Sequence, residues 1–159
     1  MKRNTYDKSN CLEMGEEAET LFKELAKSRG VEIKEASGFQ NSIEHWDIAL
    51  RKEGNWYKVE VKARKKLYRY EKEAQDRYTI IELQGVTGYP GWLYGKADFF
   101  AFAREDRFII VEKNNLIKLV EEKLTLGIYE IRTRPNRQDK FFSLQSRLID
   151  EIKTAEWLF

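Results

Sequence analysis

The chain has 159 residues and a nearly balanced charge, with 29 lysines and arginines, 27 aspartates and glutamates, and a formal net charge of +2 at pH 7. This length predicts a single domain, residues 1–159, whose core buries roughly 70% of the surface of the unfolded chain. The sequence has no run of about 18 apolar residues and no signal-peptide core, so we expect a cytoplasmic protein without a membrane span. One cysteine and one histidine exclude an internal disulfide and a zinc-ribbon or zinc-deaminase centre.

The first predicted element is a helix over residues 15–29, which ends at Gly30. Glu19 falls on the edge of its apolar stripe and is the acid best placed to reach toward a sheet. The alternative is that Glu19 is a surface residue whose negative charge interacts favourably with the N-terminal end of the helix dipole. The sequence leaves both roles of Glu19 open. The apolar residues at helical spacing are Ala18, Leu21, Phe22, Leu25 and Ala26.

Residues 44–52 and 55–63 both alternate with period two and predict a β-hairpin. Gly54 follows Glu53 and suits a tight turn, because glycine reaches positive φ without steric cost. A two-residue loop at 53–54 places Asp47 opposite Glu60, whereas a loop at 54–55 makes the two residues diagonal. The apolar face of the hairpin would comprise Trp46, Ile48, Leu50, Tyr57, Val59 and Val61.

Both registers keep Asp47, Glu60 and Lys62 on one face of the hairpin. Two carboxylates that face each other across a ladder cost up to about 1 kcal/mol, so Asp47→Asn should relieve repulsion in metal-free protein. A divalent cation would offset the same repulsion, because Mg²⁺ binds hard oxygen ligands and often takes only one or two protein carboxylates. Lys62 could orient a water and stabilise transition-state charge. The alternative is a solvated ion-pair ladder on an exposed strand.

The order of a helix with a glutamate, an aspartate and then Glu-x-Lys resembles the PD-(D/E)XK nuclease superfamily. It looks most like the archaeal Holliday-junction resolvases and related phage or prokaryotic endonucleases. Trp46 stands where the superfamily has proline, and Gln84 and Tyr89 lack the glutamine–tyrosine spacing of another branch. The residues that carry the resemblance are Gly15, Glu19, Gly30, Asp47, Glu60, Val61 and Lys62.

The resemblance implies an α/β fold with a mixed central β-sheet flanked by helices, that is, a restriction-endonuclease-like core. It implies that Mg²⁺ or Mn²⁺ is held by Asp47, Glu60 and the Val61 carbonyl, with Glu19 assisting. It further implies a catalytic role for Lys62 beside Asp47 and Glu60, and a DNA partner.

Two basic clusters fit phosphate binding. The first cluster supplies the candidate nucleic-acid-binding residues. In sequence, Tyr68 lies among these residues and Tyr70 directly follows the last of them. Solvated charged loops are the alternative for both clusters. The candidates in the first cluster are Arg64, Lys65, Lys66 and Arg69, and the second cluster is Arg132, Arg134, Arg137 and Lys140.

Further elements follow in chain order. Asp98 lies at the start of a predicted strand. It is either a residue that contacts the side chains of the catalytic site or a strand-end cap or ion-pair partner. The apolar C-terminus, residues 157–159, should dock on the core or on a second subunit in a homodimer. The predicted elements are a strand at 31–37, a helix or mobile loop at 64–77, a strand at 78–83, irregular backbone at 85–95, a hairpin of 97–103 and 108–111, a helix at 114–126, a strand at 128–133 and a helix at 142–157.

The sequence therefore predicts a metal-dependent endonuclease that hydrolyses DNA phosphodiester bonds. Restriction-type activity, repair-type activity and the junction-resolving activity of recombination share this core. The sequence leaves open which of them applies, including selectivity for junctions or branched DNA. The alternative is a non-catalytic nucleic-acid-binding or interaction module on a nuclease-like fold.

Overall fold

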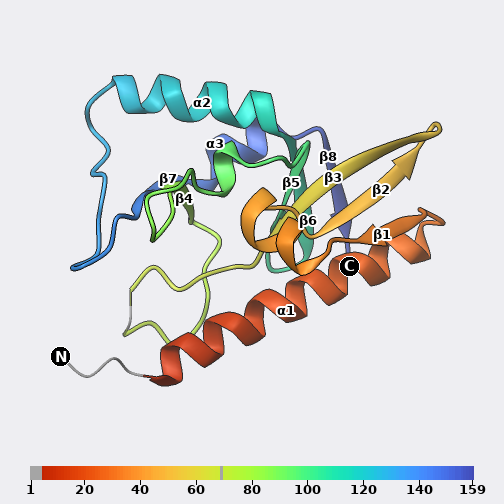
Figure 1. Cartoon of the computed structure of the whole chain (residues 1–159), viewed down its shortest axis with the longest axis horizontal. Helices are drawn as coiled ribbons and strands as arrows, with labels where there is room; N and C mark the ends of the chain where they lie inside the picture. Colours follow the sequence, from red (N-terminus) through yellow and green to blue (C-terminus); the bar gives the residue numbers. More distant parts are fainter. Residues whose placement is uncertain (1–4, 69) are drawn as a thin grey trace.

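The computed structural model describes residues 5–68 and 70–159, with side chains from residue 13 onward. A six-stranded sheet in the order β1-β2-β3-β5-β6-β8 forms the centre, and β4 and β7 form a separate two-stranded sheet (Figure 1). The strands are β1 (Ile33–Glu35), β2 (Ile48–Lys52), β3 (Asn55–Lys62), β4 (Tyr78–Gln84), β5 (Phe99–Ala103), β6 (Arg107–Glu112), β7 (Lys140–Gln145) and β8 (Ala155–Leu158). The helical elements are α1 (Thr5–Ser28), η1 (Gln40–Glu44), η2 (Trp92–Tyr94), α2 (Lys113–Thr125) and α3 (Ser146–Glu151).

The central sheet is mixed, because β3 and β5 run parallel while the other neighbouring strands run antiparallel. A parallel pair needs a long crossover, and here residues 63–98 supply it. Helices cover the sheet on both sides. The predicted α/β class with a mixed central sheet flanked by helices is confirmed.

The β2–β3 hairpin turns at Glu53 and Gly54, whose φ angles are 51° and 82°. Positive φ at both central residues is typical of a type I′ turn, which matches the twist of the flanking strands. Ile48 pairs with Val59, so the predicted two-residue loop at 53–54 is confirmed over the regular ladder.

One apolar layer lies between the sheet and α1. Phe22 of α1 is fully buried against alternate residues of the central strands, and Trp157 of β8 stacks on its ring at 5.0 Å between centroids. The members from β2 and β3 are Ile48, Val59 and Val61. Alternation therefore places these three residues on one apolar face of the hairpin, as predicted, and this face packs against α1.

A second, larger layer covers the opposite face of the sheet. It combines α2, η2, α3 and the β4–β7 sheet around Phe100 and Phe102. Trp46 packs in this layer with Ala49, so its predicted place beside Ile48 is wrong. Trp46 lies before β2 begins at Ile48, next to the left-handed His45 with its φ of 57°, so the period-two alternation of the strand does not extend back to it.

Several predicted boundaries change in the structure. The first helix begins at Thr5, well before residue 15, and the 31–37 strand is reduced to β1. Residues 64–68 and 70–77 are irregular, although an isolated bridge joins Lys65 to Gln75. The strand predicted at 128–133 is only a bridge from Arg132 to Phe141.

The helix predicted at 142–157 is wrong, because this region holds β7, the six-residue α3 and β8. Phe142 and Leu144 are buried while Phe141 and Ser143 between them are more open, which is the period of a strand. The C-terminus docks on the core of its own chain, where Phe159 lies 5.6 Å from Phe108 between ring centroids. Among the described helices, none combines the length and apolar character needed to cross a membrane.

Candidate metal and catalytic site

Asp47 lies where the chain enters β2, and hydrogen bonds fix its carboxylate. Its N–H donates to the Val59 carbonyl at 2.8 Å, and its Oδ2 accepts the Val61 N–H at 2.6 Å. Asn41 of η1 donates its side-chain amide to Oδ1. The side chain is only 7% exposed. Asp47 therefore joins the loop before β2 to the C-terminal half of β3.

Glu60 projects from β3 onto the face of the sheet that the larger apolar layer covers, since it pairs with Phe100 of β5. It is 5% exposed, and its Oε2 has no hydrogen-bond partner among the described residues. Burial, and secondarily the charge of Asp47, raise the pKa of Glu60 to about 7 despite the opposing effect of Lys62. A buried, unsatisfied carboxylate oxygen is costly, and a bound cation would satisfy it.

Lys62 is the cation of the site. Its Nζ lies 2.5 Å from Glu60 Oε1 and 5.0 Å from the ring centroid of Trp92. The side chain keeps 24% of its surface exposed. It is therefore held between a carboxylate and an aromatic face, with solvent on its remaining side.

Glu19 approaches the same acids from α1. Burial raises the pKa of its carboxyl to about 7, and the negative charges of Asp47 and, more weakly, Glu60 add to this effect. The helix therefore brings Glu19 within electrostatic reach of the hairpin acids. The structure thus gathers the sequence-predicted Glu19, Asp47, Glu60 and Lys62 in one place.

The donor chemistry fits a hard divalent cation. No group of three or more His, Cys, Asp or Glu side chains in the described part of the chain is arranged to hold a metal ion. Mg²⁺, however, commonly uses one or two protein carboxylates and completes its shell with waters and phosphate oxygens. Asp47, the unpartnered oxygen of Glu60 and the Val61 carbonyl are consistent with such a site.

The first basic cluster lies in the irregular segment after β3. The Arg64 guanidinium donates to Asp76 at 2.6 Å and to the Ala74 carbonyl at 3.2 Å, so it stabilises the segment itself. Lys65 is exposed and Lys66 is half-buried, while Arg69 lies outside the described residues. Their nucleic-acid-binding role stays a prediction.

Two contributors to the site carry no sequence motif. Asn41 hydrogen-bonds Asp47 from a single π-helical turn, and Trp92 covers Lys62 from η2. Trp92 is 6% exposed. Its place depends on Gly91, where a Cβ would lie 2.4 Å from the Glu82 carbonyl oxygen. The Gly-Tyr-Pro-Gly-Trp run of residues 88–92 signals a constrained turn, but nothing in the sequence links it to Lys62.

Asp98 has a structural role as a strand-end cap, which was one of the two roles that the sequence left open. Its Oδ2 accepts the Lys58 N–H at 2.8 Å, and its N–H donates to the Lys58 carbonyl at 2.8 Å. It therefore secures the start of β5 against β3. Of the aromatic residues in the irregular segment 85–95, Tyr89 is 74% exposed and Tyr94 is 42% exposed.

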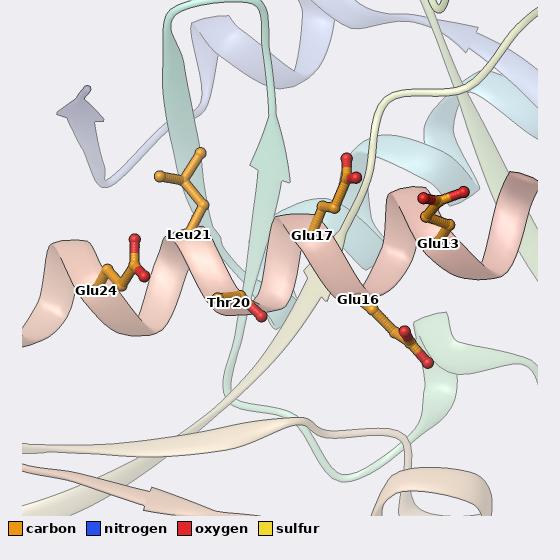
Figure 2. A pocket seen from close by; sticks show the side chains of 6 residues that line it. All are labelled: Glu13, Glu16, Glu17, Thr20, Leu21 and Glu24. Atoms are coloured by element: carbon orange, nitrogen blue, oxygen red, sulfur yellow. The ribbon is translucent and has the colours of Figure 1, made fainter.

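The exposed side of α1 carries a different chemistry. A shallow depression there is lined by four glutamates together with Thr20 and Leu21 (Figure 2). Its negative charge disfavours phosphate, so this side of α1 is not a candidate DNA surface. The four acids are Glu13, Glu16, Glu17 and Glu24.

Comparisons with known proteins give little further guidance. No protein-family model matches the chain, and no curated protein matches it. Among solved structures, the chain is similar to a bacterial homing endonuclease, I-Ssp6803I, with a TM-score of 0.47 and 18% sequence identity, over 66% of this chain and 70% of that one. A likeness this distant assigns neither a family nor an activity.

Proposed function

We propose that this protein is a divalent-metal-dependent endonuclease that hydrolyses DNA phosphodiester bonds. The supporting observation is the buried Glu60 carboxylate, which has one oxygen without a partner and the other paired with Lys62. Asp47 lies beside it, held by the Val61 N–H. Burying two acids and a lysine together costs folding stability, and such clusters of buried charges are typical of functional sites. This cluster therefore favours a role in phosphate chemistry over a purely structural role.

The residues of the site would have different roles in the reaction. Asp47, Glu60 and the Val61 carbonyl would hold Mg²⁺ or Mn²⁺, with Glu19 completing the acidic environment from α1. When bound, such a cation neutralises phosphate charge and makes water a better nucleophile. Lys62, open to solvent on one side, would orient the attacking water and donate to a phosphate oxygen as negative charge develops.

Trp92 and Asn41 would act as positioning residues. The Trp92 ring limits where the Lys62 ammonium can lie, and Asn41 limits the rotation of the Asp47 carboxylate. Both act through another side chain, and preorganisation of this kind is what catalytic geometry requires.

The second candidate is a non-catalytic nucleic-acid-binding module on the same fold. The observation that favours it is the absence, among the described residues, of a preformed group of three metal-binding side chains. The two candidates differ in one measurable respect, which is turnover.

The test incubates the pure full chain with linear duplex, single-stranded, flapped and four-way-junction DNA in Mg²⁺, Mn²⁺ or EDTA. We expect cleavage of at least one substrate with metal and none in EDTA. Preferential cleavage of the junction or flap would support structure selectivity. Binding without cleavage on every substrate would reject the nuclease proposal in favour of the binding module.

A further inference from the structure

We propose that the loop of residues 132–140 is a second DNA-binding surface, which contacts the phosphate backbone away from the candidate catalytic site. The choice of DNA as the ligand rests on the proposed function, whereas the loop itself is argued from its own contacts and charges. The loop carries four basic residues and one acid, and these are Arg132, Arg134, Arg137, Lys140 and Asp139.

The loop is held in shape by hydrogen bonds. The backbones of Arg132 and Phe141 exchange two hydrogen bonds, of 2.8 and 3.1 Å, which close its ends. Gln138 attaches the returning side of the loop to the neighbouring turn, since its N–H donates to the Val86 carbonyl at 3.1 Å and its carbonyl accepts the Gln84 side chain. A loop that is already ordered loses less conformational entropy on binding.

The single acid of the loop is shielded and neutralised. Asp139 is 1% exposed. The Arg134 Nε donates to its Oδ2 at 2.5 Å, and the Arg134 N–H donates to Oδ1 at 3.3 Å. Burial opposes ionisation, but these bonds keep the pKa of Asp139 below its ordinary value. Arg134 and Asp139 therefore stabilise the loop and leave its other cations uncompensated.

The remaining cations of the loop are exposed or partly exposed. Arg132 and Lys140 are exposed and Arg137 is half-buried, and none of the three has a side-chain hydrogen bond or ion pair among the described residues. Guanidinium groups bind phosphate through paired N–H donors. A fixed loop with three unpaired cations and no exposed acid is complementary in charge to a nucleic-acid backbone.

The position of the loop provides a matched control. It lies in the connection from α2 to β7, at the opposite end of the molecule from the β2–β3 turn (Figure 1). Arg51 of β2, near that turn, is 48% exposed and pairs with Glu32. Removing Arg51 changes the net charge by the same amount as removing one loop arginine, but at a distant place.

The experiment measures binding of a labelled DNA duplex to the full chain in EDTA by fluorescence anisotropy, over a series of salt concentrations. The double variant Arg132→Ala/Arg137→Ala leaves Arg134 in place and should weaken binding by between about 10- and 60-fold at 0.1 M salt. The slope of log affinity against log salt should fall by about two, one for each lost phosphate contact. Arg51→Ala should keep the wild-type slope, and Arg132→Lys/Arg137→Lys should retain most of it.

Each outcome has a distinct meaning. An unchanged slope in the alanine double variant, with wild-type melting behaviour, overturns the loop proposal and leaves the catalytic proposal standing. A fall in slope in Arg51→Ala that is half the fall in the double variant also overturns it, because the loss would then follow net charge, with one charge removed in the control and two in the double variant. A reduced slope in a protein that never cleaves DNA supports the loop and rejects the nuclease. Wild-type protein that binds no DNA rejects both.

Discussion

At the scale of single residues, Asp47 combines a structural task with a proposed metal-binding one. Its two carboxylate oxygens accept hydrogen bonds from Val61 N–H and from Asn41, and each oxygen keeps another lone pair for a cation. These hydrogen bonds give Asp47 a structural role that does not depend on metal. The sequence could predict its position near Glu60, but not these two donors.

This geometry reverses the sequence-based expectation for Asp47→Asn. An asparagine would turn an N–H₂ group toward one of two donors, and a buried donor without an acceptor costs about 1–3 kcal/mol. We therefore predict that Asp47→Asn lowers the free energy of unfolding in EDTA by that amount. Denaturant melts measure the change, with the exposed Glu122→Gln as a control that should stay within about 0.5 kcal/mol of wild type. A stabilised Asn variant would mean that charge repulsion outweighs the two hydrogen bonds.

Glu19 gives a prediction on pH. Its folded-state pKa of about 7 exceeds the ordinary value of 4.5, so between these values the folded state binds more protons than the unfolded state. The stability of the metal-free protein should therefore fall as pH rises through this window.

Glu19→Gln should remove part of this fall and raise the free energy of unfolding at pH 8 by about 1 kcal/mol, a figure reduced for the solvent around this half-buried side chain. Melts at pH 5 and pH 8 in EDTA measure it, with the exposed Glu16→Gln of the same helix as control. An identical pH profile in wild type and Glu19→Gln would show that Glu19 is not near the other acids.

At the scale of elements, the sequence predicted the helices and strands whose hydrophobic period and flanking turn residues both indicate the same structure. The β2–β3 hairpin, the β5–β6 hairpin and α2 with its end at Gly127 were all predicted. Residues 142–157 were not, because Leu144, Leu148, Ile149 and Ile152 also fit a helical period. Pairing of β7 with β4 and of β8 with β6 decides that region, and such long-range pairing overrides local propensity.

The C-terminal strand β8 gives a prediction at this scale. Trp157 stacks on the fully buried Phe22 and lies under the Arg29 guanidinium, whereas its neighbour Leu158 is 59% exposed. Trp157→Ala should lower the free energy of unfolding by about 2–4 kcal/mol, because a large aromatic contact is lost from the α1 layer. Leu158→Ala should change it by less than about 1 kcal/mol. Equal effects in thermal melts of the two variants would show that β8 is not docked as described.

At the scale of the whole molecule, the candidate site lies where three separate parts of the chain meet. The hairpin supplies Asp47, Glu60 and Lys62, α1 supplies Glu19, and the crossover between β3 and β5 supplies Trp92. The hairpin residues could be predicted because they lie close together in sequence and share a strand period. Trp92 could not, because its position depends on how residues 63–98 fold back over the sheet.

A single domain of residues 1–159 remains our proposal for the full chain, and the predicted homodimer stays a prediction. The described part has two apolar layers on one shared sheet, which supports one cooperative unit. The exposed C-terminal side chains Leu158 and Phe159 are the surface on which a dimer would be sought first. Sedimentation of the pure protein over a range of concentrations measures whether the chain forms a homodimer.

The most direct test of the central proposal compares the rates of Mn²⁺-dependent DNA cleavage by wild type, Glu60→Ala and Lys62→Ala. Glu24→Ala, which removes an exposed acid from α1, serves as the matched control, and a cooperative thermal melt of each variant shows that it is folded. Glu60→Ala and Lys62→Ala should each lose at least about 100-fold in rate, since each removes a group that stabilises charge in the transition state. Glu24→Ala should cleave like wild type. Cleavage by folded Glu60→Ala at the wild-type rate, with undiminished dependence on Mn²⁺, would contradict the assignment of this site.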